Sequence, residues 1–183
     1  YTKMVIKESF LNLLEKKDIS QITVKEICED ADINRATFYS HYTDVYDLLK
    51  KIEDEFLDNV NAYLSQLDKK GKNADDYTLA ERIFDYIKDN AKLCRLLLSE
   101  RGDISFQKKI MTIVYDTMSE LTDINKISKE DADYVYSFTI TGCVGIVQKW
   151  FDDNMKKSSR FMSETVIKLT YGVINAMTSQ NKK

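Results

Sequence analysis

The chain has 183 residues, enough for one large or two small domains. Hydrophobic residues make up 43% and charged residues 31%, an ordinary balance for a folded domain that excludes a disordered chain. There is no proline and there are only five glycines, which favours long helices over a turn-rich β architecture. The net charge of −3 lacks the basic excess typical of proteins that bind nucleic acid.

Membrane and disulfide-stabilised classes are also disfavoured. The most apolar stretch, residues 138–147, falls well short of the roughly 18–20 residues that span a bilayer. Three cysteines, odd in number and widely separated, fit reduced thiols in a cytoplasmic protein better than a disulfide framework. Because the sequence begins at Tyr1 and not at Met, we expect a short leader to precede it in the native chain.

The first fifty residues predict three short helices. Apolar residues at helical spacing predict a helix over residues 2–17. A second helix begins at Thr23, where Glu26 three residues later completes the signature of a capping box, and it runs to residue 31. Asp32 tolerates the left-handed backbone of a tight turn, and Asn34 can cap a third helix over residues 34–41.

The remainder predicts a larger helical body. From Asp44 to Leu67 the apolar residues keep helical period, and the polar stretch 68–77 predicts a surface loop. A break is expected at residues 101–103, and helices are expected at 79–90, 91–100, 104–121, 128–154 and 159–179. We therefore predict an all-α protein with a three-helix head, residues 1–46, and a helical body, residues 47–183.

The second and third helices, separated by a tight turn, predict a helix-turn-helix, whose second helix usually lies in the major groove of DNA. Ile33, Phe38 and Tyr42 can face inward, which leaves the polar residues of the third helix outward. Arg35 could donate two hydrogen bonds to a guanine, Thr37 could contact a thymine methyl group or a phosphate, and Ala36 allows close approach. The candidate DNA-binding residues are Thr23, Lys25, Asn34, Arg35, Ala36, Thr37, Tyr39, His41 and Lys50.

Several of these are candidates for phosphate contacts, which set register without reading bases. Tyr39 and His41 would bind phosphates from the third helix, and Thr23 and Lys25 would do so where the second helix begins, since backbone N–H groups there favour an anion. Against this, residues 1–50 carry seven lysine or arginine residues and nine acidic ones, so the head is not basic on balance. Each residue taken singly could also be an ordinary solvated side chain or helix cap.

The stretch from Thr23 to Leu49, TVKEICEDADINRATFYSHYTDVYDLL, resembles the TetR/AcrR family of transcriptional regulators. The family pattern is approximately T-x-x-x-I-A-x-x-A-G-V-s-x-g-t-[LF]-Y-x-[HY]-F-x-s-K-e-x-L, and its F-Y-x-H-Y part is the most specific. Three departures stand out: Asp32 replaces the usual glycine, Cys28 a common alanine, and Val45 a lysine that often touches a phosphate. Lys50 or Lys51 would have to supply that last contact.

The resemblance implies a homodimer whose last two helices pair with those of its partner, and a body pocket whose small-molecule ligand changes the spacing of the two heads. We expect a repressor that a ligand releases from a palindromic operator in double-stranded DNA. The resemblance is strong over about 47 residues and weak over the body.

Aromatic and methionine side chains are dense in the body, and most should simply form its core. Some would line a pocket for a mainly apolar ligand, and we name Phe84, Phe106, Ile110, Tyr115, Tyr136 and Trp150. The apolar side of the last helix suggests a self-association surface made of Phe151, Val166, Leu169, Val173 and Met177.

Two other classes of function are alternatives to a direct DNA-binding regulator. A co-regulator that acts through a protein partner, with weak or no ligand binding of its own, would explain the acidic head, and the salt dependence of DNA binding would separate it from a direct DNA binder. An enzyme is disfavoured: His41 is the single histidine, Cys28 lies on an apolar helix face, and no glycine-rich phosphate loop is present. We predict no catalytic residues, metal site or cofactor.

Overall fold

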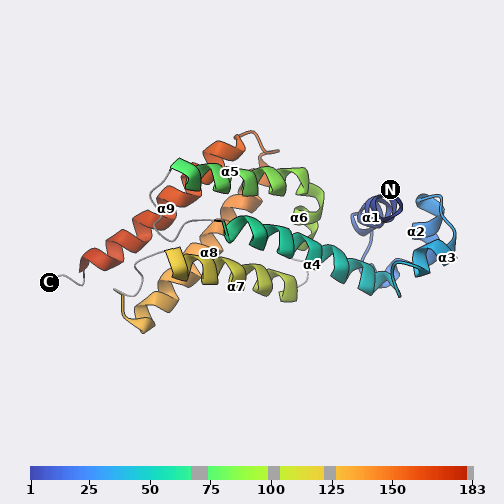
Figure 1. Ribbon diagram of the computed structural model, residues 1–183, viewed down its shortest axis with the longest axis horizontal. Helices are drawn as coiled ribbons and strands as arrows, with labels where there is room; N and C mark the ends of the chain where they lie inside the picture. The colour runs from blue at the N-terminus through green and yellow to red at the C-terminus, as the bar shows by residue number, and fades with distance from the viewer. Residues whose placement is uncertain (67–73, 99–103, 122–126, 181–183) are drawn as a thin grey trace. The chain divides into compact units, whose positions relative to one another are not determined.

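The computed structural model describes residues 1–66, 74–98, 104–121 and 127–180 (Figure 1). All regular structure within these ranges is helical, which confirms the predicted all-α fold. A 3-10 turn, Ile19–Gln21, lies between the first two helices. The helices are α1 (Thr2–Leu14), α2 (Val24–Asp30), α3 (Arg35–Tyr39), α4 (Val45–Leu64), α5 (Ala74–Asp89), α6 (Ala91–Leu97), α7 (Ile104–Leu121), α8 (Lys129–Asp152) and α9 (Ser159–Gln180).

The chain divides into two compact units, Tyr1–Asp58 and Asn59–Lys183. The sequence places a boundary after residue 46, whereas the packing carries the first unit into α4. Lys51 of α4 explains part of this difference, because its Nζ donates to the carbonyl of His41 at 3.0 Å and lies 5.3 Å from the centre of the Tyr42 ring. The first half of α4 is therefore built into the same core as α1 to α3.

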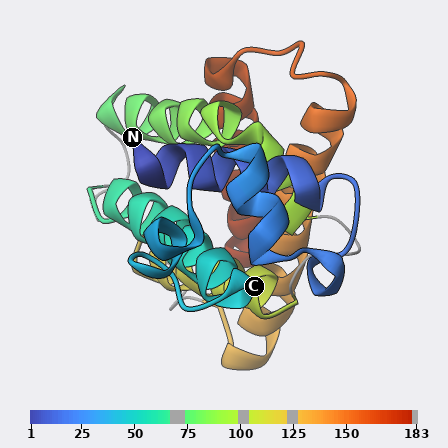
Figure 2. The same ribbon diagram turned by 90° about the vertical axis from the view of Figure 1, so that its right-hand side faces the viewer.

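Figure 2 shows the helices of the first unit, α1 to α3 and the start of α4, in blue to blue-green. Each of these four helices contributes one or more fully buried side chains to the core of the unit. Ile6, Phe10, Ile27, Phe38 and Leu48 are all 0% exposed. Burying a side chain of this size contributes about 1.5–3 kcal/mol, so each of these five residues contributes appreciably to the stability of the unit. The Ser9 hydroxyl, buried among them, donates to the carbonyl of Ile27 at 3.2 Å and ties α1 to α2.

Several helix boundaries differ from the predicted ones. α1 stops at Leu14, α3 spans Arg35–Tyr39 rather than residues 34–41, and α4 stops at Leu64. The predicted loop 68–77 falls partly outside the described residues, and its last four residues belong to α5. The predicted break at residues 101–103 lies outside the described residues.

In the second unit, α5 packs along α9, the most extensive helix pairing described. α7, α8 and α9 enclose a cluster that includes Val135, Tyr136, Ile140 and Ile174. α6 is fixed to α8 by polar contacts: the Arg95 Nη2 donates to the carbonyl of Phe151 at 2.7 Å, and the Gln148 Nε2 donates to that of Leu98 at 2.7 Å. Of the helices described, none has the length and apolar character needed to cross a membrane.

Candidate nucleic-acid interface

The capping box at the start of α2 is present as predicted. Thr23 Oγ1 accepts from the backbone N–H of Glu26 at 3.3 Å, and Glu26 Oε2 accepts from the backbone N–H of Thr23 at 3.0 Å. Lys17 Nζ also lies 2.6 Å from Glu26 Oε1. A carboxylate therefore already occupies the helix start where the sequence predicts a phosphate contact. Thr23 is the N-cap of α2. Lys25 is exposed, with its Nζ 3.7 Å from Glu29 Oε1.

The Glu26 capping box predicts a pH dependence of stability. The hydrogen bonds from Lys17 and Thr23 lower the pKa of Glu26 from 4.5 to about 2. A lowered folded-state pKa stabilises the fold above the unfolded value of 4.5, and this contribution is lost as the pH falls toward about 2. We expect Glu26→Gln to remove part of the acid-induced loss of stability between these values, measured by urea unfolding at a series of pH values. Glu29→Gln, an exposed carboxyl on the same helix, is the control, and an identical pH profile in both variants would contradict the assignment.

The turn between α2 and α3 forms as the sequence predicts. Asp32 has φ of 51°, in the left-handed region, and the backbone N–H of Ile33 donates to the carbonyl of Cys28 at 3.0 Å. This is the hydrogen bond of a Schellman motif, in which the residue after the helix adopts the left-handed conformation. Aspartate at the usual glycine position is thus compatible with the sharp reversal.

α3 is capped by Asn34, whose Oδ1 accepts from the backbone N–H of Thr37 at 2.7 Å and from its hydroxyl at 3.0 Å. Of the three residues predicted to face inward, Phe38 is 0% and Tyr42 6% exposed, whereas Ile33 is half-buried. Tyr39 is 55% exposed, and its ring meets that of Phe38 edge to face, with 5.6 Å between the ring centres. The other residues predicted to face outward differ in exposure: Arg35 and Ala36 are exposed, whereas Thr37 and His41 are half-buried.

The start of α4 is acidic. Asp44 Oδ1 accepts from the backbone N–H of Asp47 at 2.8 Å, and Asp47 Oδ2 accepts from that of Thr43 at 2.9 Å. The hydrogen bond from Thr43 and the one from Lys51 lower the pKa of Asp47. Val45, at the position of the family's phosphate-binding lysine, is buried at 6% exposure. Val45, which stands in place of that lysine, therefore packs in the core and is not exposed to contact a phosphate.

Of the two lysines that could replace that contact, Lys51 is already engaged. It donates to Asp47 at 2.9 Å as well as to the His41 carbonyl. Lys50 is exposed and is the better candidate for a phosphate. The predictions did not include Tyr46, which is 58% exposed in the first turn of α4. Its outward position could have been read from the helical period of that segment.

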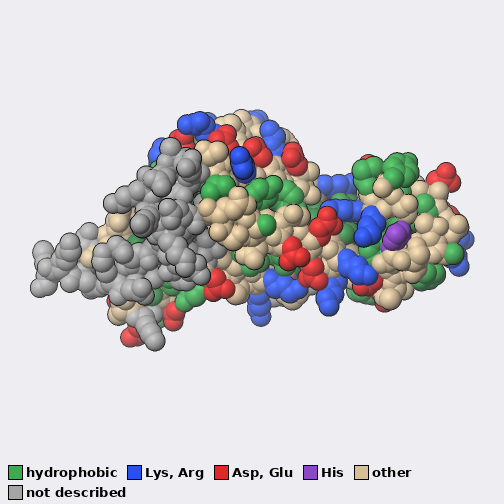
Figure 3. Space-filling model, viewed as in Figure 1, with side chains coloured by type: hydrophobic (Ala, Val, Ile, Leu, Met, Phe, Trp, Pro, Cys, Tyr) green, Lys and Arg blue, Asp and Glu red, His purple; other side chains and the backbone are tan. Residues whose placement is uncertain are grey.

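Positive charge on the first unit is local. The unit carries eight lysines and arginines against thirteen aspartates and glutamates. Figure 3 shows lysine and arginine side chains near the single histidine, His41, with acidic side chains on the same face. A phosphate-binding surface would thus rest on a few placed cations and hydroxyls rather than on a basic patch.

The residues predicted to line a pocket fall into separate packing groups. Phe84 meets Trp150 edge to face at 5.8 Å between ring centres, and Tyr115 meets Tyr136 at 4.0 Å. Phe106 is 1% exposed. Ile110, the sixth, is half-buried on α7. Most of these side chains thus fill core positions in the protomer, and their role as a ligand pocket stays a prediction.

The predicted self-association residues divide in the same way. Phe151 is 2% exposed, stacked on Trp150 and beneath the Arg95 guanidinium, so in this protomer it offers no surface to a second chain. Val173 and Met177 pack against the α7–α9 cluster, and Val166 is half-buried. Leu169 is 54% exposed and remains available. The apolar stripe of the last helix is therefore mainly the inner face of the unit.

The described residues contain no group of three or more His, Cys, Asp or Glu side chains that could hold a metal ion. Cys28 and Cys94 are buried and Cys143 is half-buried, and none of the three is part of a disulfide. Burial raises the pKa of the Cys28 thiol, which disfavours a nucleophilic thiolate at neutral pH.

Comparison with known proteins agrees with the helix-turn-helix and the helical body. A TetR family model described as a transcriptional regulator C-terminal region matches residues 72–172 of this chain. The uncharacterized HTH-type transcriptional regulator YxbF of Bacillus subtilis (strain 168) is 32% identical over 59 residues, which make up 32% of this chain and only 16% of that protein.

Solved structures share the fold across nearly the whole chain. A TetR transcriptional regulator from Streptococcus agalactiae is 20% identical, with a TM-score of 0.63, and the match covers 92% of this chain and 93% of that one. The dihydroxyacetone kinase operon activator DhaS is 15% identical, with a TM-score of 0.62 over 97% of this chain and 98% of the other. Because the family model matches more than half of the length of this chain, the chain belongs to the TetR family of transcriptional regulators.

Proposed function

We propose that the protein is a homodimeric repressor that binds a palindromic operator through α3 and leaves it when a small molecule binds the second unit. The observation that carries the proposal is the division of α3 into two faces. Phe38 fixes the helix in the core, while Arg35 and Ala36 are exposed and Asn34 holds the first turn in place. Such a helix can enter the major groove without disturbing its own packing.

Roles within this surface follow from side-chain chemistry. Arg35 is the candidate for bidentate recognition of guanine, since its guanidinium is exposed at the start of α3. Tyr39 and Lys50 are candidates for phosphate contacts, to which the exposed phenol of Tyr46 can be added. The Thr37 hydroxyl donates its proton to Asn34 in the free protein, so its oxygen can accept a hydrogen bond from a base amino group, whereas donation to a phosphate would require the bond to Asn34 to break.

A self-association surface is supported by the outer face of α8. Tyr134 and Phe138 are 74% and 67% exposed, and they share one helix face with Gly142 and Gly145. A Cβ added at either glycine would meet no heavy atom of the protomer within 4 Å. Exposed rings next to open small-residue positions suit close packing against a second α8. We propose this face, with Leu169 of α9, as the dimer interface in place of the predicted Phe151.

Arg35→Ala tests the readout directly. We expect it to weaken specific operator binding by about 1–3 kcal/mol and to relax the preference at one base pair of each half-site. The measurement is fluorescence anisotropy with the operator and with single-base variants of it. Lys16→Ala, which removes an exposed cation elsewhere in the first unit, is the control. Operator affinity and base preference unchanged by Arg35→Ala would refute the assigned role.

A second candidate function is a co-regulator that acts through a protein partner. The acidic excess of the first unit favours it, as do the carboxylates at the starts of α2 and α4. DhaS, of similar fold, is described as an operon activator, so the fold is compatible with either sign of regulation. DNA binding measured across salt concentrations separates the two functions: a direct phosphate interface loses affinity steeply as salt rises, whereas a co-regulator shows no specific binding at any salt concentration.

A further inference from the structure

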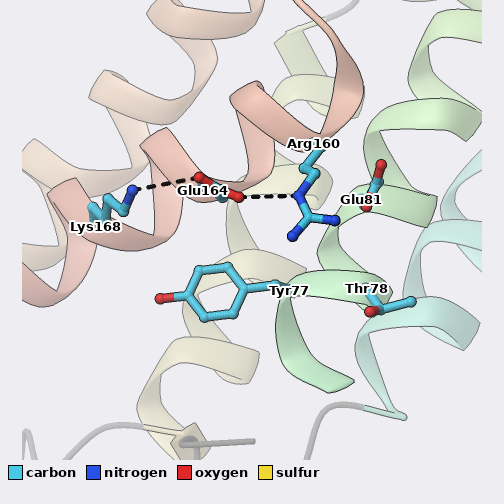
Figure 4. A pocket seen from close by; sticks show the side chains of 6 residues that line it. All are labelled: Tyr77, Thr78, Glu81, Arg160, Glu164 and Lys168. Carbon is cyan, nitrogen blue, oxygen red and sulfur yellow. Dashed lines mark hydrogen bonds and ion pairs between the residues drawn. The ribbon is translucent and has the colours of Figure 1, made fainter. Parts of the chain in front are cut away.

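A hollow of about 340 Å³ lies between α5 and α9 of the second unit (Figure 4). This volume lies in the range of small-molecule sites, about 300–1,000 Å³. The lining residues are Tyr77, Thr78 and Glu81 of α5 and Arg160, Glu164 and Lys168 of α9. None of them belongs to the aromatic pocket predicted from the sequence, and two cations and two carboxylates give the hollow a formal charge of zero.

The α9 wall is an ordered row of charges. Arg160, Glu164 and Lys168 are four residues apart and so share one face of the helix. Glu164 bridges the two cations, with Oε1 3.2 Å from the Arg160 Nε and Oε2 3.4 Å from the Lys168 Nζ. The hydrogen bonds from Arg160 and Lys168 lower the pKa of Glu164, which therefore stays ionised at neutral pH. Glu164 thus orients Arg160 rather than serving as a site for a cationic ligand.

Arg160 uses its Nε for Glu164, and Figure 4 shows its two terminal nitrogens turned away from that carboxylate, toward α5. No hydrogen bond from these nitrogens to another described residue is present. The terminal edge of a guanidinium presents two N–H groups side by side, the geometry that binds a carboxylate. The terminal N–H groups of Arg160 can therefore donate hydrogen bonds to an anionic group that enters from solvent.

The α5 wall supplies the complementary groups. Glu81 is half-buried and forms no ion pair with a described residue, so its carboxylate can accept a cationic group. Tyr77 is 39% exposed, and Figure 4 shows its ring beside the charged row of α9, below the Glu164 carboxylate. The hollow therefore combines an open guanidinium edge, an open carboxylate and an aromatic ring.

We propose that this hollow binds a small zwitterion of the aromatic amino-acid class, with its carboxylate on Arg160, its ammonium on Glu81 and its ring against Tyr77. A polyanion would face Glu81 and Glu164, and a purely apolar ligand would leave the charged groups desolvated without a partner. A zwitterion satisfies both signs of charge at once. The site names an effector class and so deepens the proposed function, on which its regulatory role rests.

Isothermal titration of the free protein with L-phenylalanine tests the site without DNA, so its failure is distinct from a failure of the repressor function. We expect saturable binding of L-phenylalanine. We expect binding weaker by about ten-fold or more for 3-phenylpropionate, which lacks the ammonium, and for phenethylamine, which lacks the carboxylate. Absence of saturable binding, or equal binding of either analogue, would overturn the proposal.

Two variants locate the binding. Arg160→Gln and Glu81→Gln should each weaken L-phenylalanine binding by about ten-fold, since each removes one charged partner. Both side chains lie at the surface of the hollow, so the variants should fold, which a thermal melt verifies. Arg82→Gln, at the exposed neighbouring position of α5, is the matched control. Binding that survives both substitutions would place the ligand elsewhere and contradict the assignment.

Discussion

Phe38→Ala should lower the free energy of unfolding of the first unit by about 3–5 kcal/mol, the usual cost of removing a buried phenylalanine. Phe38 is 0% exposed and packs against the Tyr42 ring at 5.6 Å between ring centres. Whole domains are commonly stable by only about 5–15 kcal/mol, so the loss should leave much of the helix-turn-helix unfolded and abolish DNA binding. Urea unfolding followed by circular dichroism measures it. Fluorescence of the single tryptophan, Trp150, reports on the second unit separately.

The neighbouring residue provides the control. Tyr39 is 55% exposed on the outer side of α3, so Tyr39→Ala should cost only about 0.5–1.5 kcal/mol, the usual worth of an edge-to-face contact such as the one it makes with Phe38. It should instead weaken DNA binding through the loss of a phosphate contact. If the two variants unfolded at the same urea concentration, the assignment of inner and outer faces of α3 would be wrong.

Phe138→Glu should convert the proposed dimer into monomers. Phe138 is 67% exposed in the protomer, so the protomer should tolerate the substitution, whereas an interface formed by α8 would have to bury an unpaired charge. A monomer contacts one half-site, and loss of the second contact should reduce operator affinity by about 10²-fold or more. Sedimentation velocity at micromolar concentration measures the oligomeric state, and fluorescence anisotropy measures the affinity.

Gly145→Leu separates loss of the interface from misfolding. A side chain at this position meets open space in the protomer, and replacing a mid-helix glycine by leucine should stabilise α8 by up to about 1 kcal/mol. The variant should therefore unfold at a higher urea concentration while dimerising less well. Tyr46→Glu, which changes an equally exposed ring in the first unit, should remain dimeric. A dimer undisturbed by both Phe138→Glu and Gly145→Leu would exclude the outer face of α8 from the interface.

The head could be predicted from sequence because its determinants are local. The Thr23–Glu26 capping box, the left-handed Asp32 and the Asn34 cap each depend on residues within a few positions of one another, and all three are present. The alternation of Phe38 and Tyr39 between inner and outer faces follows from the period of a single helix. Such features depend little on the rest of the chain.

The body was less predictable because several of its helices have an apolar face, and the sequence does not say which of these faces pack against each other. The sequence predicts that the apolar stripe of α9 is a self-association surface, whereas in the structure Val173 and Met177 pack within the unit. Periodicity identifies the apolar face of a helix but not the partner that covers it. The α5–α9 hollow was missed for a related reason: Glu81 and Arg160 lie far apart in the sequence, and only the packing of α5 on α9 brings them together.

The acidic first unit also shows the limit of net charge as a guide. Glu26 and Asp47 cap helices and bind Lys17 and Lys51, so these carboxylates have structural roles that a charge count does not reveal. The same pairs withdraw two lysines from any phosphate surface. Apart from Lys25 at the start of α2, the exposed cations among the predicted DNA contacts are Arg35 and Lys50.

Selection of duplexes from a random pool by the intact protein, at low ionic strength and followed by sequencing, tests the central claim most directly. Two copies of α3 should enrich an inverted repeat whose half-site centres lie about one helical turn, roughly 34–36 Å, apart. With Arg35→Ala the repeat should persist with one base position relaxed in each half. A pool that stays random after repeated rounds, or an enriched site without inverted symmetry, would contradict DNA recognition by a symmetric pair of these helices.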